Sequence, residues 1–304
     1  MTGLPAGYCA APTTATVDLP THTEEPAMIR RHPLIAFFVL AFVIGWSPWP
    51  FYAAGLLPDT NFLPIAPLIS AIVVLAMTRG WAGLRDLGAR MIRWRVPWYC
   101  YVVAVGLPLA VIFGTAWANT ALGGASWSLS AIAWADVAVM FALRWVNPLD
   151  GPLAEEPGWR GFAVPRLQAT RSPLVSAAVL GVLVAVWHTP LVISGEGNEV
   201  GWIGLATTFF ITIVYVWLFN RSRGSVLLVM LFHIVQGTIT AESFGYAGAD
   251  LDRMTWLQCA AWAAVALAVV VLDRDAWRVP PRDAVAPPAA RPAGAVLTTS
   301  VVRS

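Results

Sequence analysis

Eight long apolar runs constrain the fold of this 304-residue chain more than any other feature. A helix that crosses a bilayer needs about 20 predominantly apolar residues, which is close to the length of these runs. Only 12% of the residues are charged, whereas a soluble domain carries about 25%. The runs lie at about residues 34–56, 61–78, 97–121, 130–149, 172–193, 201–219, 225–243 and 254–272. We therefore expect an all-α, polytopic membrane helix bundle with about eight transmembrane helices.

The two ends of the chain differ in composition from its apolar middle. Residues 1–28 are rich in Thr, Pro and Ala, and residues 279–304 are rich in Pro and Ala. We expect two disordered tails on either side of a transmembrane domain at 29–278. The first apolar run starts late and is long enough to span, which argues against a cleavable signal peptide. The three cysteines are widely spaced and indicate neither a disulfide framework nor a metal cluster.

Arginine residues mark alternate loops between the apolar runs. All 19 basic residues are arginine, which is typical of a GC-rich genome and predicts a bacterial source. The first set of alternate loops and ends holds Arg30, Arg31, Arg79, Arg85, Arg90, Arg93, Arg95, Arg160, Arg166, Arg171, Arg221, Arg223, Arg274, Arg278 and Arg282. The second set holds Arg253 with Asp59, Glu196, Glu199, Asp250 and Asp252. The positive-inside rule then predicts a multi-pass protein of the inner (plasma) membrane with both termini cytoplasmic, and it places 150–171 on the cytoplasmic side.

The stretch LAEEPGWRGFAVPRLQ concentrates charge in an otherwise apolar chain. On a helix, Glu156 and Arg160 are four residues apart and can pair on one face. Glu155 is rotated by about 100° and lacks that partner, so it is the candidate general base. Pro157 predicts that a helix either restarts or kinks at this point.

Two histidines, His188 and His233, lie inside apolar runs. A lone histidine in a membrane helix is more often an interhelical hydrogen-bond donor than a catalyst, and a Glu-Arg pair beside an arginine-rich loop is usually an interfacial ion pair. By the same reasoning Asp136, Arg144 and Glu242 are interpreted as interfacial or structural. The recurrence of Glu, Glu, His and His at membrane depth nevertheless favours a functional site, because ionisable groups there are costly.

This set of side chains allows two kinds of chemistry. Glu155, His188 and His233 can bind a divalent metal such as zinc in a His₂Glu set, or they can position a water directly while the glutamate takes its proton. The chain has no HExxH and no G-x-S-x-G sequence, which excludes a zincin-type helix and gives no sign of a serine nucleophile. It also shows no phosphate-binding loop and no nucleic-acid-reading module.

These residues resemble the motifs of the CPBP intramembrane proteases, which include type II CAAX prenyl endopeptidases and bacterial bacteriocin-processing or immunity proteins. The EExxxR motif is matched by Glu155, Glu156 and Arg160. The histidine of FxxxH matches His188, with Val184 at the Phe position. The histidine of HxxxN/D matches His233. The resemblance covers about residues 130–245, which we interpret as the catalytic core.

The resemblance implies an intramembrane endopeptidase that hydrolyses a membrane-associated or hydrophobic peptide or a membrane protein within the lipid bilayer. Glu155 would activate water with help from His188, Glu156 and Arg160 would support the site, and His233 would help to stabilise the oxyanion. The family's mechanism uses either a bound metal or the glutamate alone, and both use the same residues. We expect the site to lie in a conical intramembrane cavity.

One position departs from the motifs in a way that bears on the chemistry. Gly237 stands where the third motif has Asn or Asp, and Gln236 is one residue earlier. Loss of an oxyanion donor typically costs about 100-fold to 1,000-fold in rate. The sequence therefore also allows a slow enzyme, or a non-catalytic self-immunity or membrane interaction protein. If the missing amide limits the rate, Gly237→Asn should raise activity. A proton-relay transporter is a third reading, but the chain shows no internal repeat to support it.

The depths of the candidate residues set a condition on the fold. At 1.5 Å per residue, His233 lies about 12 Å and His188 about 24 Å from the cytoplasmic start of its run, while Glu155 follows its run near the cytoplasmic surface. Straight helices would keep them apart. We therefore expect the helix that carries Glu155 to begin inside the membrane, after a break at Pro148 or Pro152, and the cavity to open to the cytoplasm.

Overall fold

The computed structural model describes residues 25–57, 61–194 and 201–280, and all regular structure within these ranges is helical. The α-helices are α1 (Glu25–Arg31), α2 (Pro33–Trp46), α3 (Trp49–Ala53), α4 (Ala66–Met91), α5 (Trp98–Ala121), α6 (Trp134–Leu143), α7 (Gly151–Glu156), α8 (Val164–Leu167), α9 (Pro173–Trp187), α10 (Thr189–Ser194), α11 (Gly201–Arg221), α12 (Val226–Thr238) and α13 (Ala249–Leu272). A π-helical segment, η2 (Pro157–Ala163), joins α7 to α8, and the short 3₁₀ turns are η1 (Leu129–Ala131), η3 (Glu242–Phe244) and η4 (Arg274–Trp277). The expected all-α membrane helix bundle is confirmed.

Six described helical segments are long and apolar enough to cross a bilayer. They are Pro33–Ala53, Ala66–Met91, Trp98–Ala121, Pro173–Ile193, Gly201–Arg221 and Ala249–Leu272. The runs at 225–243 and 130–149 contain only the shorter helices α12 and α6. With 10 residues, α6 is about 15 Å long and cannot cross a hydrocarbon core of about 30 Å. The 13 residues of α12 give about 20 Å. Neither the run at 130–149 nor the run at 225–243 therefore contains a helix of the expected spanning length.

The helical segment that follows α6 is the charged stretch itself. The segments α7, η2 and α8 follow one another without a break from Gly151 to Leu167, and every residue from 154 to 165 is buried. The stretch expected as a cytoplasmic loop is instead at the centre of the protein. The expected break is confirmed: α6 ends before Pro148, and α7 starts anew with the Asp150 side chain accepting a hydrogen bond from Gly151 N.

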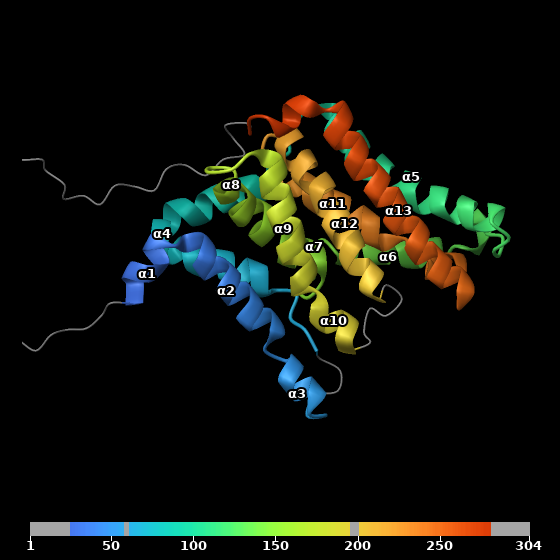
Figure 1. The fold of residues 1–304 in the computed structure, drawn as a ribbon, viewed down its shortest axis with the longest axis horizontal. Helices are drawn as coiled ribbons and strands as arrows, with labels where there is room; N and C mark the ends of the chain where they lie inside the picture. The colour runs from blue at the N-terminus through green and yellow to red at the C-terminus, as the bar shows by residue number, and fades with distance from the viewer. Residues whose placement is uncertain (1–24, 58–60, 195–200, 281–304) are drawn as a thin grey trace, which may run out of the picture.

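The remaining helices surround this central segment. Helix α4 packs against α2 on one side and against η2 on the other, while α12 packs against both α5 and α7. Helix α11 lies between α9 and α13. In Figure 1 the succession runs from α2 through α9, α11 and α12 to α13 and α5. The charged segment is therefore enclosed by elements from both halves of the chain.

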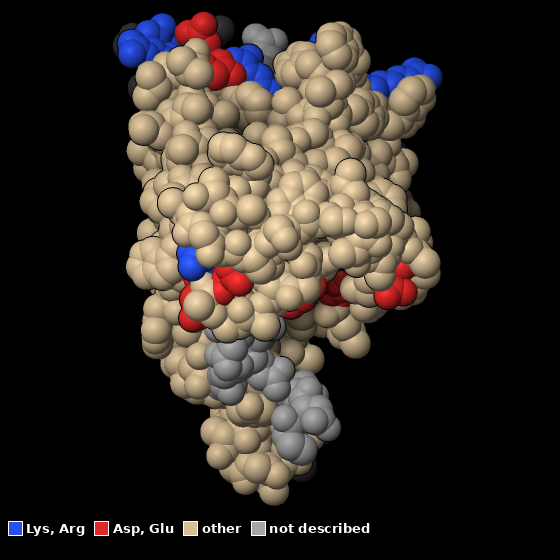
Figure 2. Space-filling model, turned by 90° about the vertical axis from the view of Figure 1, so that its right-hand side faces the viewer, with Lys and Arg blue, Asp and Glu red and all other residues tan. Residues whose placement is uncertain are grey.

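One end of the bundle collects most of the arginines, and we call it the arginine end. Its segments are held together by Arg30 donating to Met77 O, Arg93 donating to Arg223 O and Arg221 pairing with Asp273. The Arg221 hydrogen bond keeps the pKa of Asp273 below its usual value. The described arginines in these segments are Arg30, Arg31, Arg79, Arg85, Arg90, Arg93, Arg95, Arg166, Arg171, Arg221, Arg223, Arg274 and Arg278. Figure 2 shows basic residues grouped at one extremity of the face drawn.

The opposite end, which we call the acidic end, is formed by the C-terminus of α5, the segment 122–133, the end of α12 and the start of α13. Its described charged residues are Asp136, Glu242, Asp250, Asp252 and Arg253. Asp250 ties the segments together because its carboxylate accepts from Asn119 and from Ala125 N. Acidic side chains appear towards this end in Figure 2. The chain thus has two chemically distinct ends, as the arginine pattern predicts.

Two expectations about loops and tails need correction. Helix α4 does not stop near residue 78 but continues to Met91 through a break at Gly80, whose φ of 56° favours glycine. Helix α1 begins at Glu25, inside the region 1–28 for which the composition predicts disorder. Residues 1–24 and 281–304 lie outside the described residues, so the rest of the two tails stays a prediction.

The close packing of η2 on α4 depends on Gly158. A Cβ at this position would lie 2.5 Å from the Pro67 carbonyl oxygen and 2.6 Å from its carbonyl carbon. Because backbone atoms cannot move aside as a side chain can, Gly158→Ala should lower the free energy of unfolding by about 1–3 kcal/mol. Thermal unfolding in detergent measures this. Gly114→Ala in α5, where a Cβ meets nothing within 4 Å, is the matched control, and equal losses in both variants would refute the packing argument.

Candidate active site

Three of the predicted site residues converge where α7, α9 and α12 meet. Glu155 Oε1 lies 4.0 Å from His188 Nε2. A Cβ at Gly151 would lie 3.0 Å from the same Glu155 oxygen and 3.1 Å from His233 Nε2. The glycine that begins α7 therefore leaves a small space between Glu155 and His233. The two histidines, 45 positions apart in the sequence, face one carboxylate.

Glu156, the second glutamate, accepts hydrogen bonds from two side chains. Glu156 Oε1 accepts from Arg160 Nη1 at 3.1 Å and from His233 Nδ1 at 2.8 Å. Arg160 also donates to Thr212 Oγ1 at 3.4 Å, and its guanidinium lies 4.4 Å from the centre of the Tyr215 ring. The expected i, i+4 pairing is present, and it leaves Glu155 without a cation of its own. The sequence does not predict the contacts of Thr212 and Tyr215 with Arg160, because only the packing of α11 brings these two residues next to it.

The hydrogen bonds of the two histidines fix which ring nitrogen faces Glu155. His188 Nδ1 lies 2.8 Å from the Val184 carbonyl oxygen, which can only accept, so Nδ1 carries the proton. His233 Nδ1 likewise donates to the Glu156 carboxylate. In both rings Nε2 is therefore the atom directed at the Glu155 side.

Two tryptophan hydrogen bonds fix the end of α9, next to His188. Trp187 Nε1 donates to Ala41 O at 3.0 Å, and Trp46 Nε1 donates to Trp187 O at 2.9 Å. These bonds fix the C-terminus of α9 against α2. Val184, at the Phe position of the second motif, contributes its backbone carbonyl to His188, and any side chain leaves that bond intact. The departure at Val184 is therefore of no consequence for the orientation of the histidine.

Pro157 neither restarts nor simply ends the helix. The chain stays helical through it and changes to π-helical hydrogen bonding from Pro157 to Ala163. Single π-helical turns inside α-helices are frequent at functional sites. The wider turn carries Arg160 and keeps it within 3.1 Å of Glu156. The proline thus coincides with a local change of helix type beside the two glutamates.

The space that a side chain at Gly237 would occupy is filled by another residue. A Cβ there would overlap the guanidinium of Arg144, whose Cζ lies 2.7 Å from it. Arg144 reaches this place from the C-terminus of α6 and pairs with Asp150 at 2.9 Å. Of the two interpretations given for Arg144, interfacial or structural, the structure favours the second, because its side chain is only 12% exposed and lies against the helix of His233.

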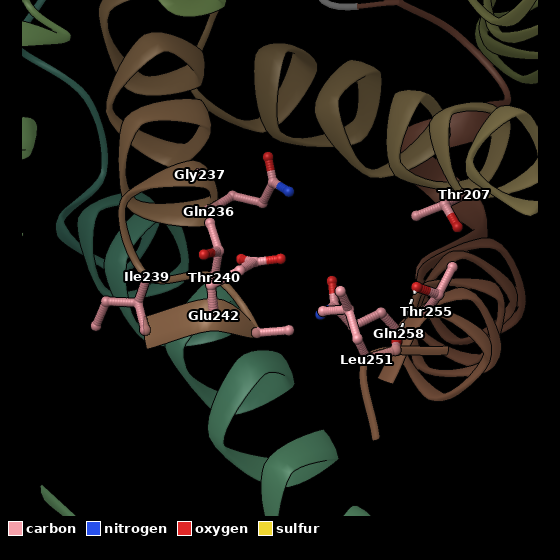
Figure 3. A pocket seen from close by; sticks show the side chains of 10 residues that line it. Thr207, Gln236, Gly237, Ile239, Thr240, Glu242, Leu251, Thr255 and Gln258 are labelled. Atoms are coloured by element: carbon pink, nitrogen blue, oxygen red, sulfur yellow. Dashed lines mark hydrogen bonds between the residues drawn. The ribbon is translucent and has the colours of Figure 1, made fainter. Parts of the chain in front are cut away.

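Gln236 does not replace the motif's amide. Its Oε1 accepts from Tyr215 at 3.4 Å, and its side chain lines a cavity beside the end of α12. This cavity of about 200 Å³ is lined by Thr207, Gln236, Gly237, Ile239, Thr240, Ala241, Glu242, Leu251, Thr255 and Gln258. Figure 3 shows the side chains of α12 and η3 facing those of α11 and α13 across it. The cavity borders the site at Gly237 and lies towards the acidic end.

The donor chemistry of Glu155, His188 and His233 suits zinc, since carboxylate oxygen and imidazole nitrogen are its common ligands. Within the described part of the chain, however, no group of three or more His, Cys, Asp or Glu residues is arranged so that it could hold a metal ion. The 4.0 Å between Glu155 and His188 accommodates a shared water instead. As arranged, these residues do not fit a metal.

Comparisons with known proteins concern the segment that carries this site. Residues 133–239 match the model of the family described as type II CAAX prenyl endopeptidase Rce1-like. A curated relative, CAAX prenyl protease 2 of Methanococcus maripaludis, is 30% identical over 92 residues, which is 27% of this chain and 33% of the relative. The aligned part thus spans about a third of the relative's length. The residues matched by the family model include all five predicted site residues, so over this segment the chain is similar to the type II CAAX prenyl endopeptidases.

Proposed function

We propose that the protein is an intramembrane endopeptidase that hydrolyses a peptide bond of a hydrophobic or membrane-associated peptide. The observation that carries the proposal is the convergence of Glu155, His188 and His233 inside a helix bundle, 4.0 Å between the first two. Buried ionisable groups without a structural partner are costly and mark functional sites. Glu156 pairs with Arg160, whereas no arginine pairs with Glu155 among the described residues.

In the proposed mechanism a water lies between Glu155 Oε1 and His188 Nε2. Glu155 accepts a proton from this water as its oxygen attacks the peptide carbonyl carbon, while His188 orients it. Glu155 then gives the proton to the departing amine. His233 donates through Nδ1 to Glu156 and helps to stabilise the developing oxyanion through the Nε2 edge of its ring. The chain's own side chains carry every proton transfer.

Cleavage of a quenched fluorescent peptide library by the purified protein in proteoliposomes tests the proposal. We expect cleavage at a reproducible bond and no loss of rate after chelation, with less than one zinc per chain by metal analysis. A His188→Ala sample serves as the control for bound metal. An inert wild type would favour the alternative, a non-catalytic self-immunity or membrane interaction protein on the same scaffold.

The position of the site along the bundle favours substrate entry from the acidic end. Helices α9 and α12 start at the arginine end, and His188 lies about 22 Å and His233 about 10 Å along them. Helix α7 starts at the acidic end, and Glu155 is only about 6 Å from its start. The cavity of about 200 Å³ lies towards the same end. On this proposal the site lies on the side opposite to the one that the sequence predicts for it.

Exposed tryptophans near both ends of the bundle favour a membrane that lies perpendicular to the line from the arginine end to the acidic end. Trp81, Trp94 and Trp98 are exposed near the arginine end, and the acidic end has a second exposed group. That second group is Trp117, Trp134, Trp202 and Trp256. Two such belts are typical of the two membrane interfaces. With the arginine end cytoplasmic by the positive-inside rule, both termini are cytoplasmic and the proposed substrate enters from the extracytoplasmic side.

Single cysteines at exposed positions of the two ends test this orientation. In a variant without the three native cysteines, Ser126→Cys at the acidic end, where the native side chain is exposed, should react with a membrane-impermeant maleimide on intact cells. Ile92→Cys at the arginine end, 73% exposed, should react only after lysis. The reverse labelling pattern would place the site on the cytoplasmic side.

A further inference from the structure

We infer that Arg144 supplies the oxyanion-stabilising donor at the position where the third motif carries Asn or Asp. The inference rests on the proposed function and adds to it a catalytic residue from the end of α6. It starts from the contact between Arg144 and Gly237, which joins two segments that are 93 positions apart in the sequence.

The place that the guanidinium occupies is defined by α12. Gly237 is one helical turn after His233, so the two positions share a face of the helix. A side chain at 237 would begin within 2.7 Å of Arg144 Cζ and Nη2 and even closer to Nη1. Arg144 therefore fills the volume of an amide side chain at 237, and only glycine leaves room for it.

Arg144 makes one hydrogen bond, from Nη2 to Asp150, while its buried Nε makes an ion-pair contact with the same carboxylate without a hydrogen bond. Its Nε lies 2.9 Å from Asp150 Oδ2, and its Nη2 donates to Asp150 Oδ1 at 3.0 Å. Nη1, the group nearest to position 237, has no hydrogen-bond acceptor among the described residues. Asp150 thus fixes one edge of the planar guanidinium and leaves the other edge free to donate.

The same aspartate connects Arg144 to the general base. Asp150 caps α7 by accepting from Gly151 N at 2.8 Å, and Gly151 borders both Glu155 and His233. The guanidinium is therefore held at a fixed position between the start of α7 and the His233 face of α12. A cation placed in this low-dielectric interior stabilises negative charge more strongly than a neutral amide, because Coulomb interactions are less screened there.

A purely structural role for Arg144 makes different predictions. If Arg144 only pairs with Asp150 to hold the start of α7, loss of either partner has the same effect, and nothing at position 237 compensates. If Arg144 donates to the oxyanion, an amide introduced at 237 restores activity, but only after the arginine has been removed. The expectation that Gly237→Asn alone raises activity is reversed, because the new side chain would overlap the guanidinium.

A swap experiment on one cleaved peptide tests the inference. Arg144→Ala should lower kcat by about 100-fold to 1,000-fold with little change in KM. Gly237→Asn alone should also lower kcat. The double variant Arg144→Ala/Gly237→Asn should exceed Arg144→Ala by about 10-fold or more, with Tm values compared for all variants.

Asp150→Asn is the matched control, since Asn retains the capping ability but removes the charge that pairs with Arg144. It should cost less activity than Arg144→Ala. Full activity of Arg144→Ala, a gain from Gly237→Asn alone, or a double variant no better than Arg144→Ala would overturn the inference. Wild type and Glu155→Gln are run in parallel, because an inert wild type would instead count against the proposed function.

Discussion

Glu155→Gln should lower kcat for peptide cleavage by about 100-fold to 10,000-fold, the range that general-base catalysis contributes. The amide has the same shape as the carboxylate but cannot accept a proton from water. Because Glu155 has no cationic partner of its own and is buried, removal of its charge should leave the Tm in detergent unchanged or higher. Single-turnover cleavage of one identified peptide measures the rate.

Asp136→Asn is the control for this variant, since Asp136 is an exposed carboxylate on α6 and its loss should leave both rate and Tm unchanged. A Glu155→Gln protein that cleaves at more than a tenth of the wild-type rate would exclude Glu155 as the base. A protein that loses activity and Tm together would instead assign the glutamate a structural role.

The neighbouring ion pair should show the opposite behaviour, with its main effect on stability. Arg160→Met leaves Glu156 fully buried with only His233 as a partner. Removal of one member of a buried ion pair costs about 3–5 kcal/mol, because the remaining charge is uncompensated. We therefore expect the free energy of unfolding to fall by about this amount, which denaturant titration in micelles measures.

The double variant Glu156→Gln/Arg160→Met provides the matched comparison, since it removes both charges. It should be more stable than Arg160→Met alone. Glu156→Gln alone completes the cycle. If the losses of the two single variants simply add in the double variant, the pair contributes no coupling energy, and the assignment of Glu156 as the structural glutamate would fail.

The sequence predicts the membrane bundle because apolar length is a direct consequence of bilayer thickness. It fails at 130–149, where composition alone cannot separate a helix that crosses the membrane from a short helix at one end of the bundle. The same error placed Glu155 after a membrane span, near the cytoplasmic surface, and only the depth argument moved the start of its helix into the membrane. The helical segment Gly151–Leu167 carries two glutamates and two arginines. The packing of neighbouring helices buries it, and hydropathy does not predict this packing.

The candidate site shows the same division between local and tertiary information. The pairing of Glu156 with Arg160 follows from helical spacing, and the break before α7 follows from the depth argument. The contact of Arg144 with Gly237 does not, because it depends on how α6 folds back across α12. A departure from a motif at one position can thus coincide with a side chain supplied from another element, which no local pattern reveals.

The most direct test of the account is a double-mutant cycle between Glu155 and His188, whose side chains lie 4.0 Å apart. The kcat/KM values of Glu155→Gln, His188→Ala and the double variant are measured on one peptide in proteoliposomes. If both residues act on one water, each single variant loses most of the activity and the double variant is hardly worse than either. Losses that multiply, or a fully active His188→Ala protein, would contradict a shared site.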